Sequence, residues 1–218
     1  MKSVVFLPWI GKNYENTGYN RKKILILGES HYSKCKYCGV SNCKIKDRKP
    51  SINNKCKERT YLINKYLEFL KGNEEKERWF NTYTNFSKAF LGFNCNNDSI
   101  IDFWNSILFY NYVQEPLIGP SNRPTKKMFK NAEKPFFEIL KKYNPGIIIV
   151  WGVELWKKGL PFEKFTKGPT ILRFPSGFYN NGIREIPVFY INHPNRGFKI
   201  ETWSKFLKKV FSMALDEN

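Results

Sequence analysis

The sequence predicts an α/β fold: a three-layer α/β/α sandwich around a central, mostly parallel four-stranded sheet. Two observations support this prediction. Four short apolar runs, rich in β-branched and aromatic residues, recur at 23–28, 106–111, 146–152 and 187–192. Segments with helical periodicity separate them. Continuous apolar runs are typical of parallel strands buried on both faces, and strand–helix alternation is typical of right-handed crossovers.

Three of the intervening segments have the spacing of amphipathic helices: 57–71, 124–142 and 199–214. A further short strand is predicted at 170–174, with no indication of its direction. Because no repeat or long linker divides the chain, we expect residues 1–218 to form a single domain. A four-cysteine insertion interrupts that domain at about 33–57.

The composition suggests an intracellular protein with a polyanionic partner. No apolar run is long enough to cross a bilayer, and the apolar stretch near the N-terminus is too short for a signal peptide. We therefore expect a cytoplasmic monomer without membrane association. Lys and Arg number 37 against 19 Asp and Glu, a net charge of +18 that favours nucleic acid. The alternative is that the Lys-rich and Asn-rich composition reflects an AT-rich genome.

Each predicted strand is followed by residues that a turn does not require. These are Glu29-Ser30-His31, Asn111-Tyr112, Trp151-Gly152 and Asn192-His193-Pro194. Ligands of open parallel sheets bind outside the carboxyl ends of the strands, and both histidines of the chain fall at such ends. The sequence therefore predicts a functional site at this edge of the sheet.

These four strand ends resemble, in order and over most of the chain, the motifs of the uracil-DNA glycosylase superfamily. GESHY (28–32) stands at the first motif, which activates water and closes over the base. SILFYNYV (106–113) resembles the strand ending in the Asn that reads the base edge. GIIIVWGVELWKKGL (146–160) resembles the aliphatic strand, Trp-Gly turn and basic helix. INHPNRGF (191–198) is similar to the last motif, a His-Pro loop that enters the minor groove.

The chain departs from the family at several of these positions. Ser30 stands where the classical uracil enzymes have Asp, and Glu29 is like the thermostable bacterial and archaeal branch. His31 and Tyr32 replace the Pro and small residue that usually follow. After His193 the loop reads Pro-Asn-Arg in place of Pro-Ser. These differences concern the identity of the base more than the class of reaction.

The resemblance implies catalytic roles for Glu29, His193 and Asn111. Cleavage of an N-glycosidic bond needs an anion near C1′ and hydrogen-bond donors at the departing base. Glu29 would stabilise the sugar cation or orient water, or it only holds the loop through backbone amides. His193 would donate to the base oxygen, or it contacts phosphate. Asn111 would read the base edge, or it caps a turn.

The target base must leave the duplex and stack in a pocket. The pocket residues we expect are Gly28, Ser30, His31, Tyr32 and Trp151, with Trp9 and Tyr14 as weaker wall candidates. The expected DNA contacts are Pro194, Asn195, Arg196, Lys199 and Arg123. Arg196, with Lys199, would hold phosphates or fill the vacated stack.

The hypothesis from the sequence is a DNA glycosylase acting on a uracil-like or modified base, in repair or anti-phage defence. One alternative is a catalytically inactive reader of damaged or modified DNA, which the replacement by Ser30 favours. The other is a nuclease using Glu29, His31 and a metal, which ranks lower because few acidic residues follow the other strands.

Four cysteines in the insertion have the spacing C-x2-C-x4-C-x12-C: Cys35, Cys38, Cys43 and Cys56. In a cytoplasmic chain this spacing favours a structural zinc site, because the surrounding residues are too polar to fold unaided. A 4Fe-4S cluster is the alternative, since some members of the resembling superfamily hold one, and unliganded thiols are the third reading. We expect no organic cofactor.

Elemental analysis and a visible spectrum of the purified protein test the cysteine prediction. We expect zinc and a colourless solution, and substitution of any of the four cysteines by Ser should release the metal. A brown protein containing iron would support the cluster, and a metal-free protein would overturn both metal readings.

Overall fold

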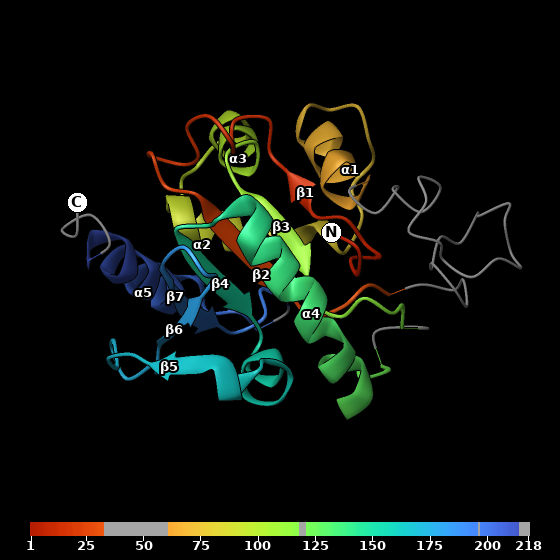
Figure 1. Cartoon of the computed structure of the whole chain (residues 1–218). Helices are drawn as coiled ribbons and strands as arrows, with labels where there is room; N and C mark the ends of the chain where they lie inside the picture. Colours follow the sequence, from red (N-terminus) through yellow and green to blue (C-terminus); the bar gives the residue numbers. More distant parts are fainter. Residues whose placement is uncertain (33–60, 118–120, 196, 214–218) are drawn as a thin grey trace, which may run out of the picture.

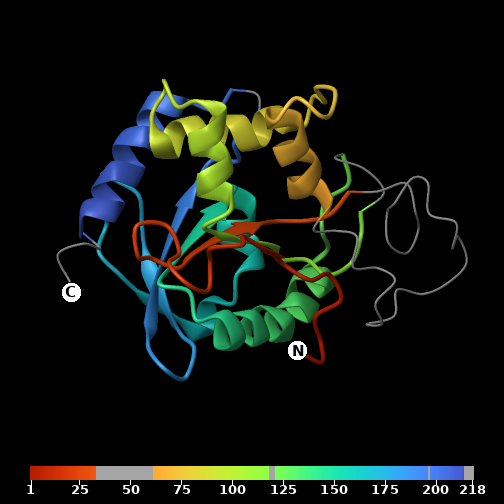
Figure 2. The same ribbon diagram turned by 90° about the horizontal axis from the view of Figure 1, so that it is seen from above.

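The computed structural model describes residues 1–32, 61–117, 121–195 and 197–213, which form a seven-stranded mixed sheet between two helical layers (Figure 1). Figure 2 shows α4 alone on one side of the sheet and α1, α2, α3 and α5 on the other. The helices are α1 (Tyr61–Leu70), α2 (Phe80–Leu91), α3 (Asn97–Trp104), α4 (Lys126–Tyr143) and α5 (Ile200–Met213). Within the described residues no helix is long and apolar enough to cross a membrane.

The strand order is β1-β3-β2-β4-β7-β6-β5. The strands are β1 (Trp9–Ile10), β2 (Ile24–Gly28), β3 (Leu108–Asn111), β4 (Ile147–Trp151), β5 (Phe165–Lys167), β6 (Gly177–Asn180) and β7 (Glu185–Ile191). The four strands expected from the apolar runs are β2, β3, β4 and β7, and they are neighbours that pair in parallel. The α/β class is confirmed.

The expectation of a four-stranded sheet is wrong, because β1, β5 and β6 extend it with antiparallel pairs. Of these, β1 and β5 are edge strands of two and three residues with no buried position, and β6, next to β5, has four residues of which two are buried. They therefore lack the continuous apolar run by which a doubly buried strand is found. The expected strand at 170–174 is also wrong: this segment forms a tight turn between Ile171 and Phe174.

The three expected helices correspond to α1, α4 and α5, and α2 and α3 were not expected. The sequence of α2 is rich in aromatic residues, Asn and Thr, which are mediocre helix formers. Its helical state depends on packing, since Phe80, Tyr83, Phe86 and Ala89 are buried against the sheet.

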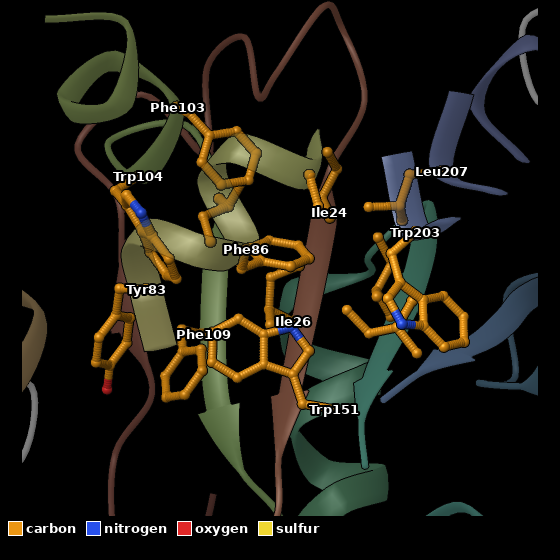
Figure 3. Close-up of a cluster of buried hydrophobic side chains, with 14 of the residues drawn as sticks. Ile24, Ile26, Tyr83, Phe86, Phe103, Trp104, Phe109, Trp151, Trp203 and Leu207 are labelled. Carbon is orange, nitrogen blue, oxygen red and sulfur yellow. The ribbon is translucent and has the colours of Figure 1, made fainter. Parts of the chain in front are cut away.

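Alternate residues of the central strands pack against different helical layers. On β2, Ile24 and Ile26 face the layer that contains α2 and α5, and Leu25 and Leu27 face α4. Figure 3 shows Trp151 of β4 among Phe86, Phe109 and Ile26, with ring centroids 4.9 Å from Phe86 and 5.3 Å from Phe109. Trp151 is only 2% exposed. It belongs to the core that supports the sheet edge, and it is not an open pocket wall.

Two turns have the same backbone form but different sequences. Each is a two-residue hairpin closed by reciprocal backbone hydrogen bonds, Tyr19 with Lys22 and Ile171 with Phe174. Both central residues have positive φ: 48° and 63° in Asn20-Arg21, and 45° and 69° in Leu172-Arg173. Asn tolerates this left-handed conformation, whereas Leu does not. The turn at Leu172 is therefore the strained member of the pair.

We expect Leu172→Asn to stabilise the protein by about 1 kcal/mol, because Leu172 is 53% exposed and loses little packing while the backbone strain falls. Urea unfolding measures the change. The reverse substitution, Asn20→Leu, is the matched control and should destabilise by a similar amount. Equal unfolding free energies for all three proteins would contradict this account of the turns.

Candidate functional site at the carboxyl ends of the strands

The parallel register brings the carboxyl ends of four strands to one edge of the sheet, here called the carboxyl rim. Gly28 of β2 pairs with Asn111 of β3, and Trp151 of β4 pairs with Ile191 of β7. The residues after each strand lie along this rim. The polar ones are unusually buried, none of them more than 8% exposed: Glu29, Ser30, His31, Asn111 and Gln114.

The GESHY segment is held to the chain after β3 by its own backbone. The carbonyls of Gly28, Glu29 and His31 accept hydrogen bonds from the amides of Tyr112, Val113 and Leu117. The β2–β3 ladder therefore continues beyond both strands. It fixes the loop without using any of its side chains, which leaves the carboxylate, hydroxyl and imidazole for other partners.

The carboxylate of Glu29 pairs with a guanidinium, and among the described residues no backbone amide donates to it. Arg123 Nη2 donates to Glu29 Oε2 at 2.7 Å and lies 3.5 Å from Glu154 Oε2. Burial raises the pKa of Glu29, the Arg123 charge opposes this, and Glu154 adds to it; the net direction is upward. Glu29 is therefore a carboxylate more basic than an ordinary Glu.

Asn111 and His31 form the second polar pair of the rim. Asn111 Nδ2 lies 3.2 Å from His31 Nδ1, and with the amide so oriented Nδ1 accepts and the ring proton is on Nε2. The Oδ1 atom of Asn111 occupies the space that a Cβ on Gly28 would need. Position 28 therefore requires glycine, because the Asn111 side chain lies too close to leave room for a Cβ atom. Asn111 does not act as a turn cap here, because its side chain contacts the GESHY segment.

Gln114 is a structural member of the rim that the sequence did not single out. Its Nε2 donates to the Asn111 carbonyl at 2.9 Å, and its Oε1 accepts from the amides of Val5 at 3.0 Å and Phe6 at 2.9 Å. Phe6 in turn meets the His31 ring edge-on, with centroids 4.7 Å apart. One buried amide therefore fixes the N-terminal segment against both members of the Asn111–His31 pair. Its only sequence signal was a Gln near a strand end.

A pocket opens beside this pair, and we call it the Trp9 pocket. Its lining residues are Leu7, Trp9, His31, Leu62, Ile63, Phe109 and Asn111. The walls are aliphatic and aromatic, and the polar groups come from Asn111 and His31. The Trp9 ring is held by a 3.2 Å hydrogen bond from Nε1 to the Trp104 carbonyl. The pocket is small, with a volume of about 10 Å³ that holds about one water, and it lies where Asn111 and His31 meet apolar side chains.

The other expected wall residues lie elsewhere. Tyr14 is fully buried and donates from its hydroxyl to the Tyr143 carbonyl, so it is a core residue. Tyr32 is 41% exposed and bridges Leu117; burial and the Glu29 charge both raise the pKa of its hydroxyl. Within the described part of the chain, the buried Ser30 hydroxyl has no hydrogen-bond partner.

His193 lies on the exposed loop after β7, beside the aromatic core. Its ring centroid is 6.2 Å from that of Trp151. Desolvation by the surrounding protein, followed by the Arg123 charge, lowers the pKa of His193. The loop is anchored to α2, because Asn85 Nδ2 donates to the Pro194 carbonyl at 3.1 Å. His193 is therefore a neutral imidazole near pH 7.

Arg123 links the two ends of the rim. Its charge affects the pKa values of both Glu29 and His193, so the carboxylate and the imidazole share one cationic neighbour. Only β4 separates β2 from β7, which sets the two backbones about 10 Å apart at this edge. The segments that follow β2 and β7 therefore lie at the same edge of the sheet.

Three other residues that we expected to contact DNA are described by the structure: Pro194 is buried, and Asn195 and Lys199 are exposed. Arg196 and the four cysteines lie outside the described residues, so the metal site stays a prediction from the sequence. Among the side chains that the structure describes, no group of three or more His, Cys, Asp or Glu is arranged to hold a metal ion.

We expect Gly28→Ala to displace the Asn111 amide and to weaken its contact with His31, because the new methyl group and Oδ1 need the same space. Overpacking of this kind costs about 1–3 kcal/mol of stability. Nitrogen NMR of the His31 ring reports the lost contact. Gly146→Ala is the matched control, since a Cβ there meets nothing nearer than 3.4 Å. An unchanged His31 spectrum in Gly28→Ala would contradict the described geometry.

Comparison with known proteins gives no match: no protein-family model matches the chain, and no curated protein matches it.

Proposed function

We propose that the chain is a DNA glycosylase that hydrolyses the N-glycosidic bond of a flipped-out base, uracil-like or modified. The observation that carries this proposal is the carboxyl rim, where the buried carboxylate of Glu29 lies at the same edge of the sheet as His193 and as the Asn111–His31 pair that lines the Trp9 pocket. The resemblance of the strand-end motifs to uracil-DNA glycosylases supports the same reaction class.

The pocket has the polarity of a nucleobase site, but its volume of about 10 Å³ is that of a single water, so its lining would have to open to admit a base. Trp9 and Phe109 supply aromatic surface, and stacking of a base on such a surface contributes about 1–3 kcal/mol. The Asn111 amide carries both donors and an acceptor, which matches the alternating pattern of a base edge. The base edge would be recognised from Asn111.

The order of groups along the rim suggests where a nucleoside would lie. The pocket lies at β1 and β3, Glu29 follows β2, and His193 follows β7. A base held against Asn111 would direct its glycosidic bond toward Glu29. Because β7 lies three strand spacings from β3, about 14 Å, the His193 loop would have to move toward the base for the imidazole to reach its oxygen.

In the proposed reaction, water adds to C1′ as the bond from C1′ to the base breaks. Glu29 accepts the proton of the attacking water, and its upward pKa suits this role as general base. The electron pair of the broken bond moves to the base, whose oxygen accepts a hydrogen bond from His193. Loss of one such donor typically costs 10²–10³ in rate.

The net charge of +18 supports a DNA partner, because phosphates dominate the affinity of proteins for nucleic acid. An inactive reader of modified DNA is the second candidate. It is favoured by Ser30 in the first motif and by the ion pair that occupies Glu29. The same pocket would serve either protein, and only product formation separates them.

Oligonucleotides carrying uracil, damaged bases or modified cytosines, incubated with the protein and then with alkali, test the function. Cleavage only after alkali marks an abasic product and supports a glycosylase. Strand scission without alkali would identify a nuclease, and tight binding without product would identify a reader. Mass spectrometry of the released base names the substrate.

We expect Glu29→Gln and His193→Ala each to lower the single-turnover rate of base release by about 10²-fold or more, with DNA affinity nearly unchanged. Gln retains the size of Glu29 but accepts no proton. Glu163→Gln, at an exposed position on the α4 side of the sheet, is the control and should keep the wild-type rate. Unchanged rates in both rim variants would refute their assigned roles.

A further inference from the structure

Arg123 has an unusual position for a residue expected to bind phosphate: it already neutralises the buried acid of the rim. Its side chain is 46% exposed, whereas that of Glu29 is 9% exposed. A carboxylate so far removed from water requires a partner. Among the described residues, Arg123 is the cation that supplies it.

Glu154 shares the same guanidinium but does not depend on it. Lys158 Nζ donates to Glu154 Oε1 at 3.0 Å, on a carboxylate that is 41% exposed. The Glu154–Arg123 distance of 3.5 Å is longer than the 2.7 Å distance from Arg123 to Glu29. If Arg123 moved away, Glu154 would keep a cation and solvent, whereas Glu29 would keep no cation among the described residues and little solvent.

The geometry of Arg123 leaves it open to an anion from solution. Both carboxylate contacts use Nη2, and a guanidinium has five N–H donors in a planar fork that matches phosphate oxygens in pairs. Arg123 lies two residues before Thr125, whose hydroxyl caps α4 by accepting from the Met128 amide at 3.2 Å. Its backbone is thus anchored while its side chain is exposed at the rim where DNA would bind.

We propose that Arg123 is a positioning residue that a backbone phosphate of bound DNA draws away from Glu29, so that DNA binding itself unpairs the carboxylate. This inference rests on the proposed function, since it assigns the anion to DNA and a catalytic role to Glu29. In the free protein, Glu29 would be ionised and paired with Arg123. In the complex with DNA, the Glu29 carboxylate would be unpaired and would lie beside the sugar.

The exchange changes two groups in the productive direction. In the free protein Arg123 opposes the rise in the pKa of Glu29 and contributes to the lowered pKa of His193. When a phosphate neutralises or displaces the guanidinium, both pKa values rise. Glu29 then becomes a stronger base, and His193 gains a proton more readily and becomes a better donor to the departing base.

Carbon-13 NMR of the Glu carboxyl groups tests the exchange without turnover, with the Glu29 signal assigned by its absence in Glu29→Gln. An intact duplex with no damaged or modified base is the probe. Saturation with this duplex should raise the titration midpoint of Glu29 by about 1 pH unit or more in the wild-type protein. Arg123→Gln should show the raised midpoint without DNA and little further change with it.

Arg184→Gln is the matched control. Arg184 is also exposed, but it donates to Asn144 at the amino ends of the strands, so this variant should titrate like the wild type. Arg123→Lys keeps the charge without the fork and should keep the midpoint of the free wild-type protein. A Glu29 midpoint that neither saturating DNA nor Arg123→Gln moves would overturn the inference, as would failure of the duplex to bind.

The titration separates this inference from the proposed function. It uses DNA from which no base is released, so the phosphate exchange can be observed in a protein that proves to be an inactive reader. Conversely, if the protein releases a base but DNA does not change the titration midpoint of Glu29, the proposed function stands and the phosphate exchange is refuted.

Discussion

The parallel pairing of β3, β2, β4 and β7 is the constraint on which the rest of this molecule depends. Because the four strands run in the same direction, their carboxyl ends meet at one edge, in the register that pairs Gly28 with Asn111 and Trp151 with Ile191. A shift of one residue in any pair would turn its side chains to the opposite face of the sheet. Because every position of β2 is buried, its register depends on the packing of Ile24 and Ile26 against one helical layer and of Leu25 and Leu27 against the other.

Once the strand ends meet, their polar side chains must find partners within a small volume. A buried polar group without a partner costs about 1–3 kcal/mol, and more if it is charged. Residues far apart in the sequence meet this requirement at three places: Arg123 pairs with Glu29, Gln114 with the N-terminal segment, and His31 with Asn111. Among the described residues the buried Ser30 hydroxyl has no partner.

The electrostatics of the rim differ from those of the whole chain. The protein carries a large positive charge, yet the described part of its rim holds two carboxylates, Glu29 and Glu154, around Arg123. In the proposed glycosylase, positive charge elsewhere would attract DNA while Glu29 acts at the sugar.

Much of the fold and part of the site were predictable from the sequence. Doubly buried strands appear as continuous apolar runs, and amphipathic helices show their period, so the four parallel strands and α1, α4 and α5 were found. The polar residues after those strands were also visible. The short strands β1, β5 and β6 were not predicted, because short strands with exposed positions have no comparable pattern.

The partners of the site were decided by tertiary structure alone. Nothing in the order of residues joins Arg123 to Glu29 across 94 positions, or distinguishes Trp9, which lines the pocket, from Tyr14, which lies in the core. The sequence pattern indicates which residues are buried, because each strand or helix must place its apolar residues at the spacing of its own geometry. Which polar atoms then touch depends on the packing of elements distant in the chain, and that packing has no local signal.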